Sequence, residues 1–429
     1  MFSSESSTDQ PHGDPKALDR LLDEMTASPE EWGFGKSALT FLRGHAQPKT
    51  TLETTWGVGP EHLELFHETS DEEERAEADA ALAWQRTKFE AGFGWIGGPT
   101  EHGGGGYPDS FDRVFRMIEA EFDVPDPSPI RIGIGTVGPA LVLHSTPDIV
   151  ASFVQPLYAG RSIACQLFSE PGAGSDLAGV TTRAVRTDDG WLVNGQKVWT
   201  SNAAFADIGL ALVRTDTAAG KHAGLSMLLV NMKSPGVEVR PIRQMTGGAS
   251  FSEVFLTDVH VPARLLVGQL GGGWRVATAT LAGERKAVGD RSHEKLTRAV
   301  GLLRHLGETD GGFEDERLRR RWSEVAIGVR AARLRQQGLQ SLPADLLTPA
   351  ERTVDKLLTA NNMAAIGDLA ADLLGPRFSV DTGAWGTFAW NKWRMGALGY
   401  RIAGGTEEIL KTLVAEQVLG LPREPKATT

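Results

Sequence analysis

The segment CQLFSEPGAGSDLAG, residues 165–179, carries the densest set of groups that could position a ligand. Gly172 and Gly174 allow backbone geometry that is closed to other residues. The hydroxyls of Ser169 and Ser175 add polar groups around a turn that the proline between them favours. Such a loop can bring N–H groups and hydroxyls against a flat, polar ligand at the edge of a sheet, although an ordinary connecting loop could have the same spacing.

Other sequence patterns give little support for a dinucleotide-binding site or a metal site. Gly133, Gly135 and Gly138 match the G-x-G-x-x-G dinucleotide-binding fingerprint, but the preceding VPDPSP cannot form the buried strand that this fingerprint requires. A helix or turn that packs closely on its neighbours is the better interpretation. The ten histidines form no H-E-x-x-H motif and the chain has no C-x-x-C pair, so we expect no metal site.

Composition indicates a globular chain, most of which should fold. The chain has 429 residues, of which 41% are hydrophobic and 23% charged, near globular averages. Its net charge of −11 argues against nucleic acid as a partner, so the RLRRRW run at 317–322 is expected to be a solvated helix face or a subunit contact. A single cysteine, Cys165, excludes an internal disulfide and fits a cytoplasmic location. We expect no membrane span and no secretion signal.

Periodicity divides the chain into helical, β-rich and helical parts. The predicted divisions are a flexible tail over 1–15, an N-terminal helical domain over 16–160, a central antiparallel β domain over 161–270 and a C-terminal helical domain over 271–429. Asp189–Gly190 and Asn194–Gly195 are typical of hairpin turns in the β-rich part. This order predicts an α+β multidomain fold rather than a doubly wound sheet, in which strands and helices alternate throughout.

Four stretches together resemble the flavin-dependent acyl-CoA dehydrogenase family. SEPGAGSD followed by NGQKVWTSNA is similar to the first signature of that family. FSEVFLTDVHVPA resembles its exit from the β domain, YRIAGGTEEI its C-terminal signature and EQVLGLPRE its usual ending. The resemblance runs in the same order from roughly Trp84 to the C-terminus. The first 80 or so residues are less informative.

The resemblance implies a fold with helical N- and C-terminal domains around a β domain, and it implies FAD as cofactor. The implied reaction removes two hydrogens from an acyl thioester, on either coenzyme A or a carrier protein. A carboxylate takes the α-proton, a hydride leaves the β-carbon for the flavin, and an enoyl thioester results. Electrons would then pass to an electron-transfer flavoprotein.

The resemblance also assigns flavin and substrate contacts in the β domain. Phe168 and Ser169 of the first signature match flavin contacts, with the Ser169 hydroxyl facing the polar edge of the ring. Trp199 would pack on the isoalloxazine, and Ser201 would hydrogen-bond near its reactive nitrogen. Ser175 would lie beside the pantetheine arm of the thioester. Each of these residues could also be purely structural, so the set carries more weight than any member.

The C-terminal signature carries further expected contacts and one departure from the family. Thr406 and Glu408 would lie near the phosphates or nucleotide of the cofactor, although the family often has glutamine where this chain has Glu408. Many members carry their catalytic glutamate where this chain has Gly404, which cannot take a proton but keeps the backbone N–H of the oxyanion contact. A minority place that glutamate on the first long helix after the β domain, and Glu284 matches this position. We therefore expect Glu284 to be the base.

The resemblance predicts an oligomer but leaves its composition open. Many members have an Arg-x-x-Phe-Gly element that reaches the flavin of a neighbouring subunit, and the comparable stretch here, LGETDGGFEDERLRRRW, lacks it. A homotetramer or a heterotetramer with a related subunit fits this departure. Two other functions remain open: a non-catalytic partner subunit of a heteromeric dehydrogenase, and a flavin monooxygenase or oxidase on the same fold.

Overall fold

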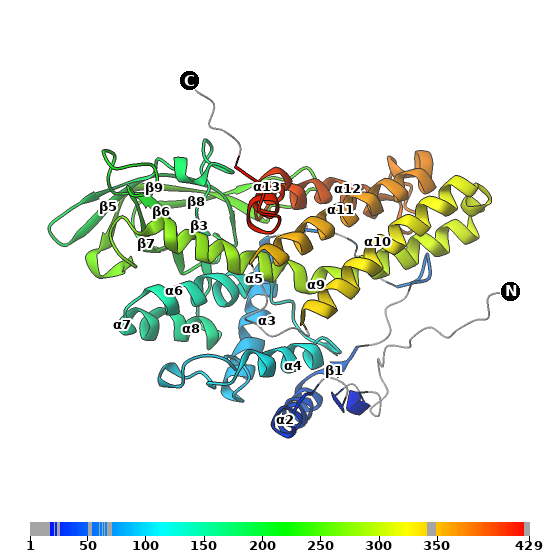
Figure 1. The fold of residues 1–429 in the computed structure, drawn as a ribbon, viewed down its shortest axis with the longest axis horizontal. Coiled ribbons are helices and arrows are strands. Elements are labelled where there is room, and N and C mark those ends of the chain that lie inside the picture. Colours follow the sequence, from blue (N-terminus) through cyan, green and yellow to red (C-terminus); the bar gives the residue numbers. More distant parts are fainter. Residues whose placement is uncertain are drawn as a thin grey trace.

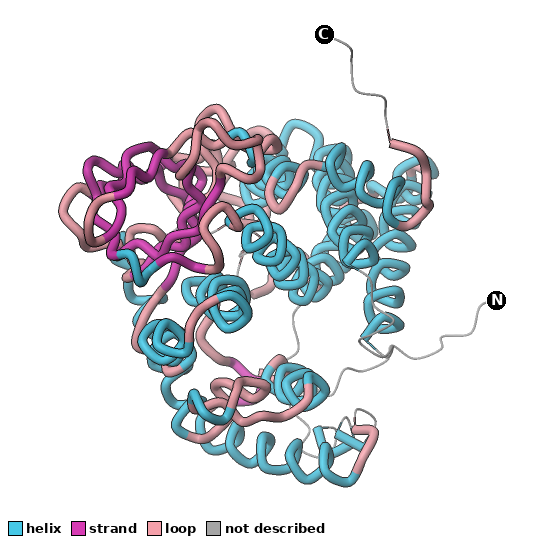
Figure 2. Tube along the Cα trace, turned by 60° about the vertical axis from the view of Figure 1, so that its left-hand side comes forward, coloured by secondary structure: helices cyan, strands magenta, loops and turns pink. Residues whose placement is uncertain are grey.

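The structure is a computed structural model, and most of its strands form one sheet while helices make up most of the remainder (Figure 2). A separate two-stranded sheet pairs β1 (Gln47–Pro48) with β2 (Phe122–Asp123). It describes residues 18–20, 22–23, 26–49, 54–59, 61, 63, 65–66, 71–340 and 349–423. Within these, the side chains of residues 71, 282–292, 340 and 349–352 are left undescribed. The expected flexible tail at 1–15 lies outside the described residues.

Helices dominate the N-terminal part. The longer ones are α2 (Pro29–His45), α3 (Asp71–Glu90) and α4 (Asp109–Glu119), and the shorter ones are α5 (Ser128–Ile132), α6 (Gly138–His144), α7 (Pro147–Ile149) and α8 (Gln155–Tyr158). Gly133 and Gly135 lie in a π-helical turn, Gly133–Val137, between α5 and α6, and Gly138 begins α6. A Cβ at Gly138 would lie 3.0 Å from the carbonyl oxygen of Gly133 and from the Tyr158 ring. This glycine therefore serves close packing in a helix, as expected, and not a dinucleotide-binding loop.

An eight-stranded sheet forms the central part. Its strands are β3 (Ala164–Leu167), β4 (Arg183–Arg186), β5 (Gly190–Ser201), β6 (Ile208–Arg214), β7 (Leu225–Asn231), β8 (Val237–Ile242), β9 (Phe251–Pro262) and β10 (Leu266–Val267). They lie in the order β10-β7-β6-β4-β5-β9-β8, with β3 also paired to β6. The pairs are antiparallel except β3 and the single β4 bridge, which run parallel to β6. β6 and β7 are buried on both faces, and α9 packs against both strands.

One of the two predicted hairpin turns is correct. Asp189–Gly190 lies in the tight turn between β4 and β5, where the Thr187 N–H donates to the Gly190 carbonyl at 2.9 Å. The prediction for Asn194–Gly195 is wrong, because this pair lies inside β5 at a register shift against β9. A Cβ at Gly195 would be 2.7 Å from the Thr182 Cα, so the glycine allows close backbone approach at a bulge.

Among the described residues, five α-helices form the C-terminal part. They are α9 (Gly273–Thr309), α10 (Glu316–Gln340), α11 (Pro349–Leu374), α12 (Thr387–Ile402) and α13 (Glu407–Gln417). α9 runs from beside the sheet, where it packs on β7, into the C-terminal bundle, where it packs on α11 (Figure 1). Helices and the sheet thus occur in the predicted order and confirm the α+β fold class. Among the helices described, none has both the length and the apolar character needed to cross a bilayer.

The segment around Trp56–Phe66 links the two ends of the chain. The Trp385 indole donates to the Gly59 carbonyl at 2.9 Å, and the Tyr400 hydroxyl donates to the Leu65 carbonyl at 3.2 Å. Trp56 lies against Trp385 and Trp390 of the C-terminal part. The N-terminal chain therefore lies against the C-terminal helices before it enters α3.

Candidate active site

The loop after β3 is a tight turn with an open outer side. Glu170 and Ala173 exchange backbone hydrogen bonds of 3.1 and 3.0 Å, which close the turn at Pro171–Gly172. No atom lies within 4 Å of the position that a Cβ would take at Gly172 or at Gly174. Ser175 is exposed beside them. The loop therefore leaves room on its outer side for a ligand to approach.

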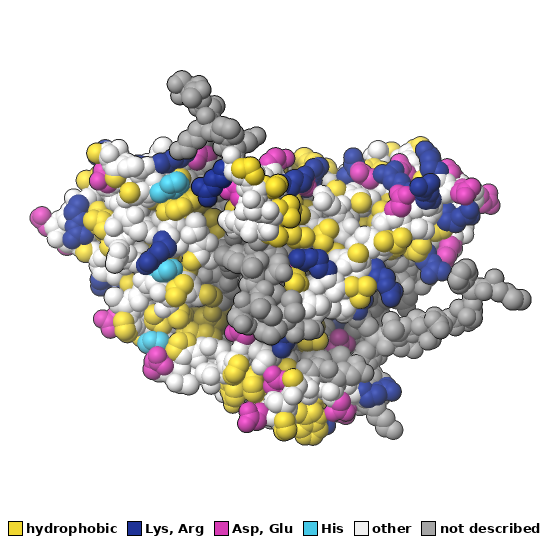
Figure 3. Space-filling model, in the orientation of Figure 1, with side chains coloured by type: hydrophobic (Ala, Val, Ile, Leu, Met, Phe, Trp, Pro, Cys, Tyr) yellow, Lys and Arg dark blue, Asp and Glu magenta, His cyan; other side chains and the backbone are white. Residues whose placement is uncertain are grey.

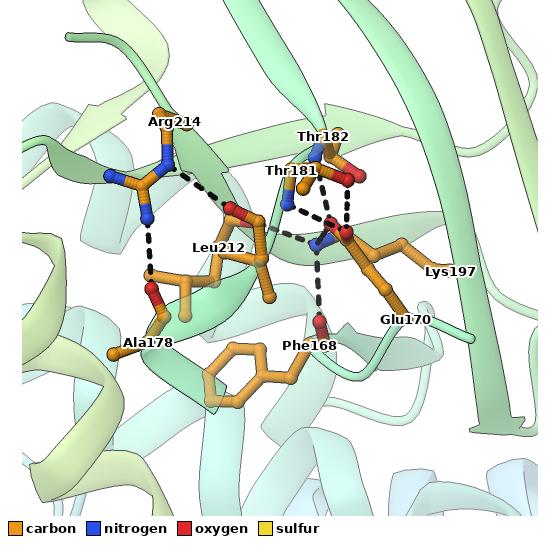
Figure 4. A network of polar contacts seen from close by, with 9 residues as sticks. Phe168, Glu170, Ala178, Thr181, Thr182, Lys197, Leu212 and Arg214 are labelled. Atoms are coloured by element: carbon orange, nitrogen blue, oxygen red, sulfur yellow. Dashed lines mark hydrogen bonds and ion pairs between the residues drawn. The ribbon is translucent and has the colours of Figure 1, made fainter. Parts of the chain in front are cut away.

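A buried ion pair holds this loop to the sheet (Figure 4). The Lys197 ammonium lies 2.8 Å from Glu170 Oε1 and also donates to the carbonyls of Phe168 and Leu212 at 3.0 and 2.7 Å. Burial favours a raised pKa for Glu170, but the Lys197 charge and the hydrogen bonds it receives outweigh burial and lower the pKa to about 2. Burial lowers the pKa of Lys197 to about 8, against the opposing effect of Glu170. Both groups are charged at neutral pH.

The same carboxylate also fixes the chain that follows the loop. Glu170 accepts hydrogen bonds from the backbone N–H groups of Thr181 and Thr182 at 2.7 and 2.9 Å. Arg214 donates to the carbonyls of Ala178 and Val180 at 2.8 and 3.1 Å (Figure 4). Both ends of the glycine-rich loop are thus attached to the sheet, which leaves its middle as the exposed part.

Trp199 stands beside the loop in an unusual backbone conformation. Its φ is +60°, which is rare for a large residue and often marks a functional position. Trp199 is 59% exposed, although the residues on either side are buried. The Val198 N–H donates to the Ser169 carbonyl at 2.9 Å, so Ser169 and Trp199 are neighbours. Ser201 ends the same strand, and both serines are half-buried.

The C-terminal signature forms a left-handed turn between α12 and α13. Gly404 and Gly405 have φ values of +67° and +96°, which favour glycine at both positions. Thr406 is the N-cap of α13, and its side chain accepts from the Ile409 N–H at 3.4 Å. Glu408 is exposed in the first turn of α13, and hydrogen bonds from its own backbone and from Thr406 lower its pKa.

A row of aromatic rings connects these two groups of residues. Trp199 contacts Phe251 at 6.2 Å between ring centroids, Phe251 contacts Phe66 at 5.6 Å, and Phe66 contacts Tyr400 at 5.1 Å. Tyr400 lies four residues before Gly404. The structure therefore brings Phe168, Ser169, Trp199 and Ser201 together in the β part, and the rings join them to the turn that holds Gly404 and Thr406.

Comparison with known proteins identifies the family. The sequence model of the acyl-CoA dehydrogenase middle domain matches residues 165–259, and that of the acyl-CoA dehydrogenase C-terminal domain matches residues 271–419. Acyl-CoA dehydrogenase IpdE1 of Mycobacterium tuberculosis is 39% identical over 349 residues, which cover 80% of this chain and 89% of that protein. The chain belongs to the acyl-CoA dehydrogenase family. It is an oxidoreductase.

Solved structures of the acyl-CoA dehydrogenase fold cover nearly the whole chain. The ChsE4–ChsE5 complex from Mycobacterium tuberculosis is 25% identical with a TM-score of 0.69, covering 93% of this chain and 100% of that chain. The Tcur3481-Tcur3483 steroid ACAD is 24% identical with a TM-score of 0.71, covering 96% and 99%. At 24% identity, the similarity to the Tcur3481-Tcur3483 structure shows the fold alone.

Acyl-CoA dehydrogenases are FAD-dependent, and the residues present here fit such a cofactor. The exposed ring of Trp199 offers a flat apolar face to an isoalloxazine. Beside it, the buried Thr200 hydroxyl has no hydrogen-bond partner among the described residues. Ser169 and Ser201, both half-buried, add hydroxyl donors and acceptors near the tryptophan.

The structure does not describe the side chain of the expected base, and it shows buried charged residues that the sequence analysis did not predict. Glu284 lies within α9, but its side chain lies outside the described residues. Sequence reasoning missed the buried pair Glu170–Lys197 and the buried Lys356, whose Nζ donates to the Gly405 carbonyl at 2.8 Å. A signal for the first pair existed, since both residues stand inside the quoted signature stretches. No sequence pattern marks Lys356.

Proposed function

We propose that this enzyme dehydrogenates an acyl-CoA at its α and β carbons and passes the electrons to an electron-transfer flavoprotein. The observation that carries this proposal is the exposed, left-handed Trp199 beside the anchored glycine-rich loop. In this assignment Trp199 packs on the flavin, which accepts the hydride when bound. Phe168, Ser169 and Ser201 contact the flavin ring, and Ser175 contacts the pantetheine arm. Thr406 and Glu408 contact the nucleotide part.

Two groups would act on the thioester in this proposal. The Gly404 N–H donates to the thioester carbonyl and stabilises the negative charge that develops there, an effect of about 3 to 4 kcal/mol per donor in comparable sites. Glu284, on α9, takes the α-proton. The absence of a side chain at Gly404 leaves room near the α-carbon, which permits a branched or bulky acyl group.

Anaerobic titration with a panel of acyl-CoA thioesters tests the function. We expect the purified, yellow protein to lose its flavin absorbance with at least one thioester, and Glu284→Gln to keep bound flavin but bleach at least about 100-fold more slowly. Glu294→Gln is the matched control, because Glu294 stands on the same helix with an exposed side chain. Stoichiometric oxygen consumption during turnover would instead indicate an oxidase or monooxygenase, and undiminished bleaching in Glu284→Gln would assign the base elsewhere.

A second candidate is a subunit of a heteromeric dehydrogenase. The ChsE4–ChsE5 structure is a complex of two named proteins, and this chain lacks the Arg-x-x-Phe-Gly element. A chain that binds flavin only when a related subunit is co-expressed would favour this candidate.

The substrate could carry its acyl group on coenzyme A or on a carrier protein. The same panel with acyl groups on a carrier protein distinguishes these two thioester carriers.

A further inference from the structure

Lys356 is a buried cation behind the C-terminal signature turn. Lys356 lies on α11 and is 2% exposed, and its Nζ donates to the Gly405 carbonyl at 2.8 Å. Lysine is almost never buried to this extent without a specific partner, because removing an ammonium group from water is costly. The Gly405 carbonyl is one partner of this ammonium group, so Lys356 connects α11 to the signature turn.

Side-chain packing does little to fix the backbone of the turn that Lys356 contacts. Gly404 and Gly405 have no side chains to pack, and both adopt left-handed φ values. Across the turn, Arg401 at the end of α12 forms a two-pronged ion pair with the buried Glu407 of α13, at 2.7 and 3.1 Å, and this hydrogen bonding lowers the pKa of Glu407. That pair holds the start of α13. The Lys356 bond holds the peptide immediately before it, between Gly405 and Thr406.

A hydrogen bond from a charged donor is stronger and more directional than a neutral one. In a buried environment, a positive charge is also screened less than at the surface. Lys356 therefore combines two effects on this turn: it orients the backbone around Gly404, and it places positive charge on the inner side of the turn.

We propose that Lys356 is a positioning residue for the dehydrogenation, which holds the Gly404–Thr406 turn in place and favours the negative charge that forms on the thioester carbonyl when the α-proton leaves. This inference rests on the proposed function, because the negative charge arises only if a thioester binds against the turn. The α-proton passes to the carboxylate base, and the electron pair of the C–H bond moves toward the carbonyl oxygen. Lys356 itself keeps its proton throughout.

The test uses the flavin-loaded full chain and a thioester analogue with sulfur in place of the β-carbon. This analogue can lose its α-proton but has no β-hydrogen to transfer, and its bound anion gives a long-wavelength absorbance band with oxidised flavin. We expect Lys356→Met to raise the pH midpoint of this band by about one unit, which is a tenfold change in ionisation. With a true substrate, we expect bleaching at saturation to slow about tenfold while the half-saturating concentration changes little.

Lys356→Gln provides a second variant, which keeps a polar donor but lacks the charge, and we expect a raised midpoint for it as well. The matched control is Lys88→Met, which removes another buried lysine, paired with Glu119 at 2.9 Å in the N-terminal part. This control lowers thermal stability but leaves the midpoint unchanged. A purely structural role for Lys356 would give the same result as the control.

The outcomes separate the two proposals. A wild-type chain that bleaches, together with an unshifted midpoint and unchanged bleaching rate in both Lys356 variants, overturns the role of Lys356 alone. A flavin-loaded wild-type chain that no acyl thioester bleaches overturns the proposed function and the role of Lys356 with it.

Discussion

Because Glu170 and Lys197 form a buried ion pair, we expect the free energy of unfolding of the enzyme to decrease at acid pH. The folded-state pKa of Glu170 is lowered to about 2, below its ordinary value of 4.5. Its stabilising effect is therefore complete above about pH 4.5 and is lost as the pH falls toward 2. We expect the free energy of unfolding, measured by urea titration, to decrease between pH 5 and 3, and to decrease less steeply in Glu170→Gln.

Replacing one partner of this ion pair should lower the free energy of unfolding more than replacing both. Glu170→Gln leaves the Lys197 ammonium buried without its carboxylate, so we expect a loss of about 3 to 5 kcal/mol at neutral pH. The double variant Glu170→Gln, Lys197→Met should recover part of that loss, since no charge is left buried. A double variant no more stable than the single one would contradict this account of the pair.

Single residues show how far the sequence can predict a site. The glycine-rich loop, Trp199 and Ser201 were predicted from their signature stretches, and the structure places Ser169 next to Trp199. The roles of Glu170 and Lys197 could not be predicted from spacing, because they are 27 positions apart and charged residues are usually solvated. Only folding brings the loop after β3 against β5 and removes the pair from water.

At the scale of elements, Phe66 connects three parts of the chain. It lies between Phe251 of β9 and Tyr400 of α12, and a Cβ at Gly399 would come within 2.9 Å of its ring. We expect Phe66→Ala to lower the free energy of unfolding by about 2 kcal/mol, less than for a fully buried phenylalanine. We also expect it to weaken flavin retention during gel filtration, because the turn at Gly404 loses its connection to the β part.

A control for this variant lies at another position of the C-terminal helices. Phe313 is a half-buried phenylalanine that contacts Trp322, away from the row of rings. Phe313→Ala should lower stability by a similar amount and keep the flavin. Equal flavin loss in both variants would show that general destabilisation, rather than the ring contacts, releases the cofactor.

The helices and strands also show which local sequence patterns were enough to predict them. Helical periodicity and β-rich runs predicted the order of helices and strands, and Asp189–Gly190 predicted its hairpin. Asn194–Gly195 has the same turn chemistry, yet the long-range pairing of β5 with β9 keeps it inside a strand. The parallel pairing of β3 with β6 likewise depends on contacts between segments that are 44 residues apart. Local sequence holds no signal for either.

At the scale of the whole molecule, an apolar surface lies at the C-terminal end of the described chain. It consists of exposed side chains on α12, on α13 and after α13: Leu398, Ile402, Ile409, Val418, Leu419 and Leu421. Figure 3 shows apolar side chains near these helices. Ile402 and Leu419 are 66% and 64% exposed. Folded monomers rarely expose a continuous apolar surface of more than a few hundred square ångströms, so this surface favours the predicted assembly into an oligomer.

Charge introduced at this surface tests whether it forms a subunit interface. We expect the wild-type chain to sediment as an oligomer at micromolar concentration, and Ile402→Lys with Leu419→Lys to sediment as a smaller species with unchanged circular dichroism. An obligate interface is largely apolar and excludes unpaired charge, so two lysines should weaken it strongly. Leu143→Lys is the control, because Leu143 is 70% exposed on α6 in the N-terminal part and should tolerate the charge. A wild-type chain that is monomeric alone and assembles only with a related subunit would assign the surface to a heteromer, whereas a monomer with full flavin content and activity would contradict assembly altogether.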